Sequence, residues 1–217
     1  MIVHRRLTSV LAASGLLIGM TLLLAGPASA GRAPQAVFHG ALAQVRMPSA
    51  ALCSNLGDPM SDAISSQNFD SQFDAYDDMG ATDCKLKRKA TVHTVVVPGT
   101  YFNGYGPAKS EKFVTYKNAS GLPGAKLDSQ TVVGADDAGT FTLTIKALTL
   151  KAGTYWFTVQ ANMAFSKGQW GWDATSTAHG QPDQWENPGN GFATCKTWCP
   201  VGNLDGGMSV DLIIGLS

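Results

Sequence analysis

The sequence predicts an all-β protein, an antiparallel β-sandwich of the jelly-roll type. Three observations predict this fold class. Short segments rich in β-branched and aromatic residues follow one another, clusters of glycine, proline and asparagine separate them, and no amphipathic helix pattern occurs after residue 80. Many short strands separated by turn residues are typical of sandwiches and jelly rolls.

Each expected strand has its own pattern. Residues 141–145 alternate strictly, which places Phe141, Leu143 and Ile145 on one face of a strand. The other segments carry alternating or continuous apolar side chains and are bounded by turn residues. The predicted strands are residues 91–97, 111–117, 127–133, 141–145, 154–162 and 208–214.

The N-terminal stretch has the layout of a secretory signal peptide. Arg5 and Arg6 precede an apolar run over residues 10–25, and small residues follow at positions 28–30. Cleavage is expected after Ala30. The apolar run is shorter than the roughly 20 residues of a membrane-spanning helix, so a cleaved signal is favoured over a membrane span. We therefore expect a secreted protein, extracellular or periplasmic, that has no membrane segment after signal cleavage.

The rest of the chain is expected to form a short arm and one folded domain. Residues 31–50 are small and weakly patterned, whereas strand-type segments begin at about residue 58. A chain of this length can bury a full core as one domain. The predicted organisation is a signal peptide at residues 1–30, a poorly ordered arm at residues 31–57 and a β-sandwich at residues 58–217.

The charge balance argues against a nucleic-acid-binding protein. The chain has 16 basic and 16 acidic residues, and loss of Arg5 and Arg6 with the signal changes the net charge from 0 to −2. A nucleic-acid-binding domain normally has a strong basic excess. The short basic cluster at residues 85–89 is interpreted as a solvated strand edge or loop, with a patch for an anionic ligand as the alternative.

The four cysteines of the chain are Cys53, Cys84, Cys195 and Cys199. An even number in an oxidising compartment indicates two disulfides. Three pairings are possible, and sequence proximity favours Cys195 with Cys199, which leaves Cys53 with Cys84. A zinc site is the alternative, but neither pair has the usual two-residue spacing of zinc ligands.

Several longer segments are distinctive in combination. They are SQNFDSQFDAYDDMGATD (66–83), VPGTYFNGYGPAKS (97–110), NASGLPGAKL (118–127), DDAGTFTLTI (136–145), LKAGTYWFTVQANMAFSKGQWGW (150–172) and QWENPGNGF (184–192). Together they resemble a family of bacterial secreted β-sandwich domains that occur alone or appended to exported proteins. The resemblance covers nearly all of residues 60–217 and implies a fold and a location. It implies no catalytic residue, because the family has no established activity.

One stretch departs from the pattern of that family. Family members usually have an Asp-Asp-Phe sequence and an apolar strand where this chain has residues 82–84 followed by a lysine-rich run. The departure leaves the boundaries of the first strand open. It also marks the pairing of Cys53 with Cys84 as a specialisation of this chain.

A run of aspartates is a candidate calcium site. Calcium prefers six to eight oxygen ligands, which closely spaced carboxylates and loop carbonyls can supply. Among Asp70, Asp74, Asp77, Asp78 and Asp83, we expect Asp74, Asp77 and Asp78 to hold the ion, in a structural role. No cofactor is required by the sequence. The alternative is a solvated loop in which the aspartates cap turns.

Aromatic and amide side chains are candidates for a ligand surface. Flat rings stack on the apolar faces of sugars, while amides bind hydroxyl groups. The candidate ligand-binding residues are Trp170, Trp172, Trp185 and Tyr105. The amides in the same region are Asn162, Gln169, Gln184 and Asn187. Packing in the core or against loops is favoured over ligand binding for the tryptophans, because Trp156, Trp170 and Trp172 stand in or beside expected strands.

No catalytic residue is predicted. The chain lacks a Gly-x-Ser-x-Gly nucleophile motif and the histidine spacings of zinc enzymes. His39, His93 and His179 are each expected to be isolated.

Two carboxylate pairs leave a hydrolytic function open. Asp136 with Asp137, or Asp183 with Glu186, would act as acid and base in glycoside hydrolysis only if they faced each other across a cleft. The leading hypothesis is a secreted, non-catalytic domain that binds carbohydrate or another cell-surface ligand. The alternatives are an exported hydrolase and a purely structural or interaction protein of the cell surface.

Overall fold

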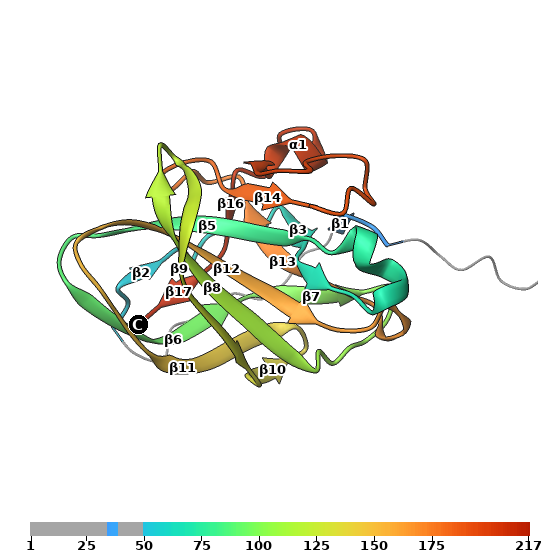
Figure 1. Cartoon of the computed structure of the whole chain (residues 1–217), viewed down its shortest axis with the longest axis horizontal. Coiled ribbons are helices and arrows are strands. Elements are labelled where there is room, and N and C mark those ends of the chain that lie inside the picture. The colour runs from blue at the N-terminus through green and yellow to red at the C-terminus, as the bar shows by residue number, and fades with distance from the viewer. Residues whose placement is uncertain (1–33, 39–49) are drawn as a thin grey trace, which may run out of the picture. The chain divides into compact units, whose positions relative to one another are not determined.

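The computed structural model describes residues 34–38 and 50–217, and this part of the chain consists mainly of strands. The predicted signal peptide and His39 lie outside the described residues. The strands form almost entirely antiparallel sheets that pack together (Figure 1), which confirms the all-β sandwich class. The jelly-roll type stays a prediction.

The first sheet is built around a buried strand. Its members are β1 (Val37–Phe38), β3 (Asp62–Ser65), β13 (Gln169–Thr175), β16 (Asp211–Leu212) and β7 (Gly99–Phe102). Strand β13 pairs with β3, β7 and β16, and every one of its residues is buried. Trp170 and Trp172 therefore lie inside the protein.

The second sheet contains the last strand of the chain as an inner member. In order, it consists of β10 (Ala135–Asp137), β11 (Thr140–Leu150), β6 (Ala90–Val97), β17 (Gly215–Leu216) and β2 (Cys53–Ser54). The alternation predicted for residues 141–145 is confirmed, because Phe141, Leu143 and Ile145 are buried.

The third sheet carries the longest hairpin. In order, it consists of β15 (Cys199–Pro200), β14 (Gln184–Glu186), β5 (Met79–Leu86), β12 (Gly153–Asn162), β8 (Ser110–Ala119) and β9 (Leu122–Val132). A short strand, β4 (Gln67–Asn68), pairs in parallel with the end of β12. This parallel pairing brings residues 94 positions apart in the chain side by side.

Aromatic contacts hold the sheets together in one core. Phe113 of β8 stacks on Phe157 of β12 with ring centroids 5.9 Å apart, and Phe141 of β11 stacks on Trp170 at 4.5 Å. All four side chains are fully buried. Burying a side chain of this size stabilises the fold by about 1.5–3 kcal/mol. The contact between Phe141 and Trp170 joins the second sheet to the first.

Helical segments are short and lie between strands. They are η1 (Ser71–Tyr76), η2 (Phe165–Lys167) and α1 (Gly202–Asp205). No helix among the described residues has the length and apolar character needed to cross a membrane.

Two sequence expectations need correction at the ends of the domain. Within the expected arm, Val37–Phe38 pairs with β3 and Cys53–Ser54 pairs with β17, so these residues belong to the sheets. The expected strand at residues 208–214 is much shorter in the structure, because only Asp211–Leu212 forms a strand, β16, and the next strand, β17, begins at Gly215 in another sheet. Between them, Ile213 donates its backbone N–H to the Asp173 carbonyl.

Both predicted disulfides are present. Cys53 is bonded to Cys84, and Cys195 is bonded to Cys199, with Cα–Cα distances of 6.2 and 5.6 Å. All four thiols are used, which removes the alternative of a cysteine zinc site. Two disulfides are compatible with an extracellular protein.

Candidate ligand-binding site

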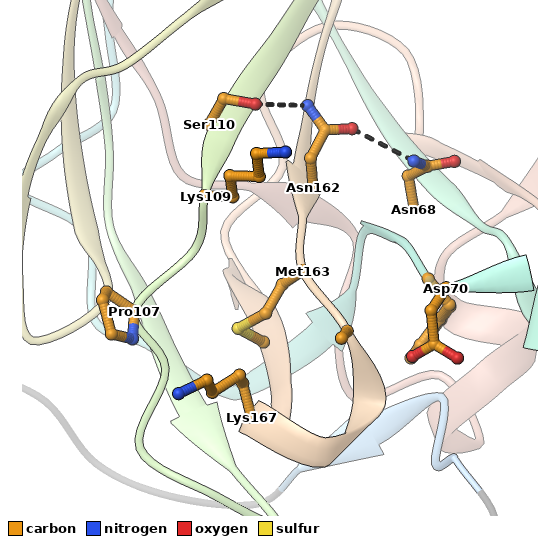
Figure 2. A pocket seen from close by; sticks show the side chains of 10 residues that line it. Asn68, Asp70, Pro107, Lys109, Ser110, Asn162, Met163 and Lys167 are labelled. Atoms are coloured by element: carbon orange, nitrogen blue, oxygen red, sulfur yellow. Dashed lines mark hydrogen bonds between the residues drawn. The ribbon is translucent and has the colours of Figure 1, made fainter.

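A cavity of about 590 Å³ lies where β4 and β12 end and where β8 and the η2 turn begin. Figure 2 shows its lining side chains. They are Asn68, Phe69, Asp70, Pro107, Lys109, Ser110, Asn162, Met163, Ala164 and Lys167. We call this cavity the amide pocket.

The strand pairing places a row of polar side chains along the amide pocket. Asn162 is opposite Asn68 in the parallel pair and opposite Ser110 in the antiparallel pair. The Asn68 side chain donates to Asn162 Oδ1 at 3.2 Å, and Asn162 Nδ2 donates to Ser110 Oγ at 2.9 Å (Figure 2). The row fixes the orientation of both amides.

The lining of the amide pocket has a net positive charge, because it contains two ammonium groups and one carboxylate. Lys109 and Lys167 belong to its lining, and neither makes an ion pair with a described residue. The Asp70 carboxylate accepts the Phe165 backbone N–H at 2.9 Å and so holds the η2 turn in place. The lysine side chains are therefore available to an acidic or hydroxylated ligand.

Apolar side chains complete the lining. Phe69 and Met163 are 5% and 4% exposed, and Pro107 and Ala164 also line the cavity. The Phe69 ring packs edge-on against Phe165 with centroids 6.2 Å apart. The amide pocket thus combines a polar row with an apolar surface, as small-molecule sites commonly do.

Tyr105 projects into solvent from the loop that leads to Pro107. Its side chain is 96% exposed. The loop is held by two hydrogen bonds, from Gly106 N to Lys167 O and from Ala108 N to the Tyr101 hydroxyl, each 2.9 Å long. Tyr105 therefore stands on an anchored loop, two residues from the lining of the amide pocket.

The three predicted ligand-binding tryptophans are core residues, which corrects that expectation. Trp170, Trp172 and Trp185 are each 0% exposed. Their indole N–H groups donate to backbone carbonyls of Gly139, Ile213 and Ser65 at 2.7–2.8 Å. With the N–H groups satisfied and the rings enclosed, none of the three can stack on a ligand from solvent. Of the four predicted residues, only Tyr105 is at the surface.

Two of the three predicted calcium ligands accept hydrogen bonds from nearby residues of the chain. Asp78 is buried and accepts the Ser65 hydroxyl and the Gln67 N–H, each at 2.9 Å, while Asp77 accepts the Phe69 N–H at 2.7 Å. Burial raises the pKa of both carboxyls.

The third predicted calcium ligand, Asp74, has an exposed side chain. The described residues contain no group of three or more histidine, cysteine or acidic side chains placed to hold a metal ion. The structure therefore does not bring Asp74, Asp77 and Asp78 together as a ligand set.

None of the four candidate carboxylates lines any of four cavities of the described chain. Asp136 accepts the Tyr101 hydroxyl at 2.6 Å, and buried Asp183 accepts the Leu212 N–H at 2.6 Å. Desolvation raises the pKa of Glu186 to about 7. Four cavities of the described chain contain at most one carboxylate each in their linings.

The histidines differ from expectation in one case. His93 on β6 is exposed, whereas His179 is not isolated, because its Nε2 lies 2.5 Å from Asp58 Oδ2.

Comparisons with family models, curated proteins and solved structures found no match to this chain. The resemblance to bacterial secreted β-sandwich domains therefore stays a prediction.

Proposed function

We propose that this chain is an exported, non-catalytic β-sandwich protein that binds carbohydrate in the amide pocket. The observation that carries the proposal is a 590 Å³ cavity in which amide, hydroxyl and ammonium groups line the same space as apolar side chains. Sugars present hydroxyl groups around apolar ring faces, so they need both kinds of contact. The signal-peptide pattern and the two disulfides support export.

The amide row has hydrogen-bonding capacity left for a ligand. An asparagine side chain has two N–H donors and one carbonyl acceptor. The contacts among Asn68, Asn162 and Ser110 use one N–H of each amide. The second N–H of each amide and the serine hydroxyl proton can therefore meet sugar oxygens, while Lys109 and Lys167 favour a sugar that carries a carboxylate.

Tyr105 adds a stacking surface beside the amide pocket. An aromatic ring that is 96% exposed on an anchored loop offers a flat surface that is well suited to the apolar face of a sugar. Tyr105 is two residues before Pro107, which lines the amide pocket. A chain of two or more sugar units can therefore contact both the Tyr105 ring and the amide pocket.

A glycan array followed by calorimetry tests the proposal. The mature chain is screened against neutral and uronate-containing oligosaccharides, and the strongest hit is titrated by isothermal calorimetry. Replacing Asn68, Lys167 or Tyr105 by alanine is expected to weaken binding by tenfold or more. The Lys151→Ala variant, at an exposed position outside the amide pocket, is the control and should bind like the parent.

A second candidate function is a purely structural or interaction protein. It is favoured by the burial of Trp156, Trp170, Trp172 and Trp185, which leaves few aromatic side chains for sugar stacking. A folded chain that binds no oligosaccharide on the array would support this function and contradict carbohydrate binding. Equal binding by the parent and all three pocket variants would contradict the assignment to the amide pocket.

A further inference from the structure

A second cavity, of about 430 Å³, lies at the turn between β5 and β6. It is lined by Ala51, Leu52, Lys85, Leu86, Lys87, Arg88 and Ala90. None of these residues lines the amide pocket. We call this second cavity the basic pocket.

All the charged side chains in the lining of the basic pocket are cations. Lys85, Lys87 and Arg88 are exposed, and no carboxylate lines the cavity. None of the three cations makes an ion pair with a described residue. The nearest acidic residue in the sequence, Asp83, accepts the Gln181 N–H at 3.0 Å and lines a different cavity, which Lys85 also borders. Three positive charges with no carboxylate in the lining of the basic pocket attract anions.

The two walls of the basic pocket are covalently joined. Leu52 on one wall is followed by Cys53, and Lys85 on the other wall is preceded by Cys84, the disulfide partner of Cys53. The Leu52 N–H also donates to the Leu216 carbonyl at 2.7 Å. The cations are therefore displayed on a fixed frame, which lowers the entropy that a ligand must remove on binding.

We propose that the basic pocket binds a phosphate or sulfate ester group. A tetrahedral oxyanion accepts several charge-assisted hydrogen bonds, and the guanidinium of Arg88 matches it with two parallel donors. The lysines at positions 85 and 87 add point charges. The cavity volume is within the range of about 300–1,000 Å³ for small-molecule sites, so there is room for the sugar or headgroup that carries the ester.

An NMR titration of the mature chain tests the basic pocket. The probes are inorganic phosphate, inorganic sulfate and glucose 6-phosphate, with glucose as the uncharged control. Glucose 6-phosphate is expected to shift the amide signals of residues 51–52 and 85–90 to saturation, and the affinity should fall as sodium chloride screens the charges. Absence of saturable shifts at these residues with all three anions would overturn the proposal.

Two triple variants distinguish specific binding in the basic pocket from a general effect of the protein's net charge. Replacing Lys85, Lys87 and Arg88 together by glutamine should weaken binding of glucose 6-phosphate by tenfold or more. The matched control replaces three other lysines, at positions 117, 126 and 151, by glutamine and changes the net charge equally; it should stay within twofold of the parent. Equal weakening in both variants would overturn the proposal. Amide dispersion in each spectrum checks that the variants fold.

Vesicle sedimentation distinguishes the source of the ester. If the ester belongs to a lipid headgroup, vesicles of phosphatidylcholine with phosphatidylglycerol should retain the parent and the control variant but not the pocket variant. If it belongs to a soluble or polymer-bound sugar, glucose 6-phosphate binds while these vesicles retain none of the three proteins. The amide signals of residues 51–52 and 85–90 report on the basic pocket and not on the amide pocket, so failure of the carbohydrate proposal leaves this test intact.

Discussion

Gly99 of β7 shows how a single residue makes space for a core tryptophan. A Cβ atom at this position would meet Trp170 Nε1 and would lie 2.5 Å from Trp170 Cε2 and 2.6 Å from the Gly171 carbonyl oxygen. The indole cannot move away easily, because Nε1 donates to Gly139 O at 2.7 Å and the ring stacks on Phe141. The absence of a side chain is therefore a packing requirement.

The variant Gly99→Ala tests this requirement. We expect the free energy of unfolding to fall by about 1–3 kcal/mol, the usual cost of overpacking a core. Gly57→Ala is the matched control, since a Cβ there has no atom within 4 Å. Urea denaturation followed by tryptophan fluorescence measures both. A Gly99→Ala protein as stable as the parent would show that the tryptophan can shift at no cost.

Residue identity predicts what a side chain can do, but exposure depends on distant parts of the chain. Trp172 and Tyr105 are both aromatic and both stand beside glycine in the sequence. Trp172 is 0% exposed and Tyr105 is 96% exposed. The difference arises because β13 pairs with three strands and is covered on both faces, while the loop around Tyr105 is anchored only at its base.

Among the elements, the strand at residues 141–145 was predicted from its alternation, whereas β13 was not predicted. Residues 141–145 alternate and form part of β11 as expected. Strand β13 has no alternation to detect, because all of its side chains are buried, and it contains Gly171. Of the expected strand at residues 208–214 only Asp211–Leu212 forms β16, while the N–H groups of Ile213 and Ile214 donate to Asp173 O and Asn55 Oδ1, partners that the local sequence does not indicate.

The amide pocket was beyond prediction for a related reason. Asn162 was identified as a candidate amide at the end of an expected strand, but Asn68 lies 94 residues earlier in the chain. Only the parallel pairing of β4 with β12 places the two side chains together. No spacing rule within the sequence connects residues that far apart.

Strand β2 is held by one disulfide and one short pairing. The Cys53–Cys84 bridge closes a ring with a sequence separation of 31, whereas the Cys195–Cys199 ring has a separation of 4. Loop-closure entropy then gives about 4 kcal/mol for the first bridge and about 2 kcal/mol for the second. The first bridge is expected to contribute more to stability.

Serine variants of each cysteine pair test this order. Replacing Cys53 and Cys84 should lower the free energy of unfolding by roughly twice as much as replacing Cys195 and Cys199. Guanidinium denaturation under non-reducing conditions measures both losses. The reverse order would mean that the structure around the short ring, rather than chain entropy, determines the contribution of each bridge.

For the whole molecule, buried carboxyls determine how stability varies with pH. Desolvation raises the pKa of Asp173 to about 7 and of Asp211 to about 6, and it raises the pKa of Asp183 well above its ordinary value. Between pH 4 and 7 the native protein therefore binds more protons than the unfolded chain. Stability falls as pH rises wherever this holds.

We expect a lower free energy of unfolding at pH 8 than at pH 5, and Asp173→Asn should reduce the difference. A rise in the pKa of Asp173 from 3.8 to about 7 corresponds to about 4 kcal/mol between its two protonation states. Denaturation curves at several pH values measure the slope. The control is Asp137→Asn, at an exposed position. An unchanged slope for Asp173→Asn would contradict the assignment.

The position of β17 between β6 and β2 has a consequence for biosynthesis. Strand β2 pairs with β17 in one sheet, so β2 leaves the ribosome long before β17 has been synthesised. At about 5–20 residues per second, the delay is roughly 10–30 s. During that interval the polypeptide exposes an incomplete edge that invites pairing with other nascent chains. Cys84, by contrast, is only 31 residues from Cys53, so in an oxidising compartment the disulfide can tether β2 before β17 pairs with it.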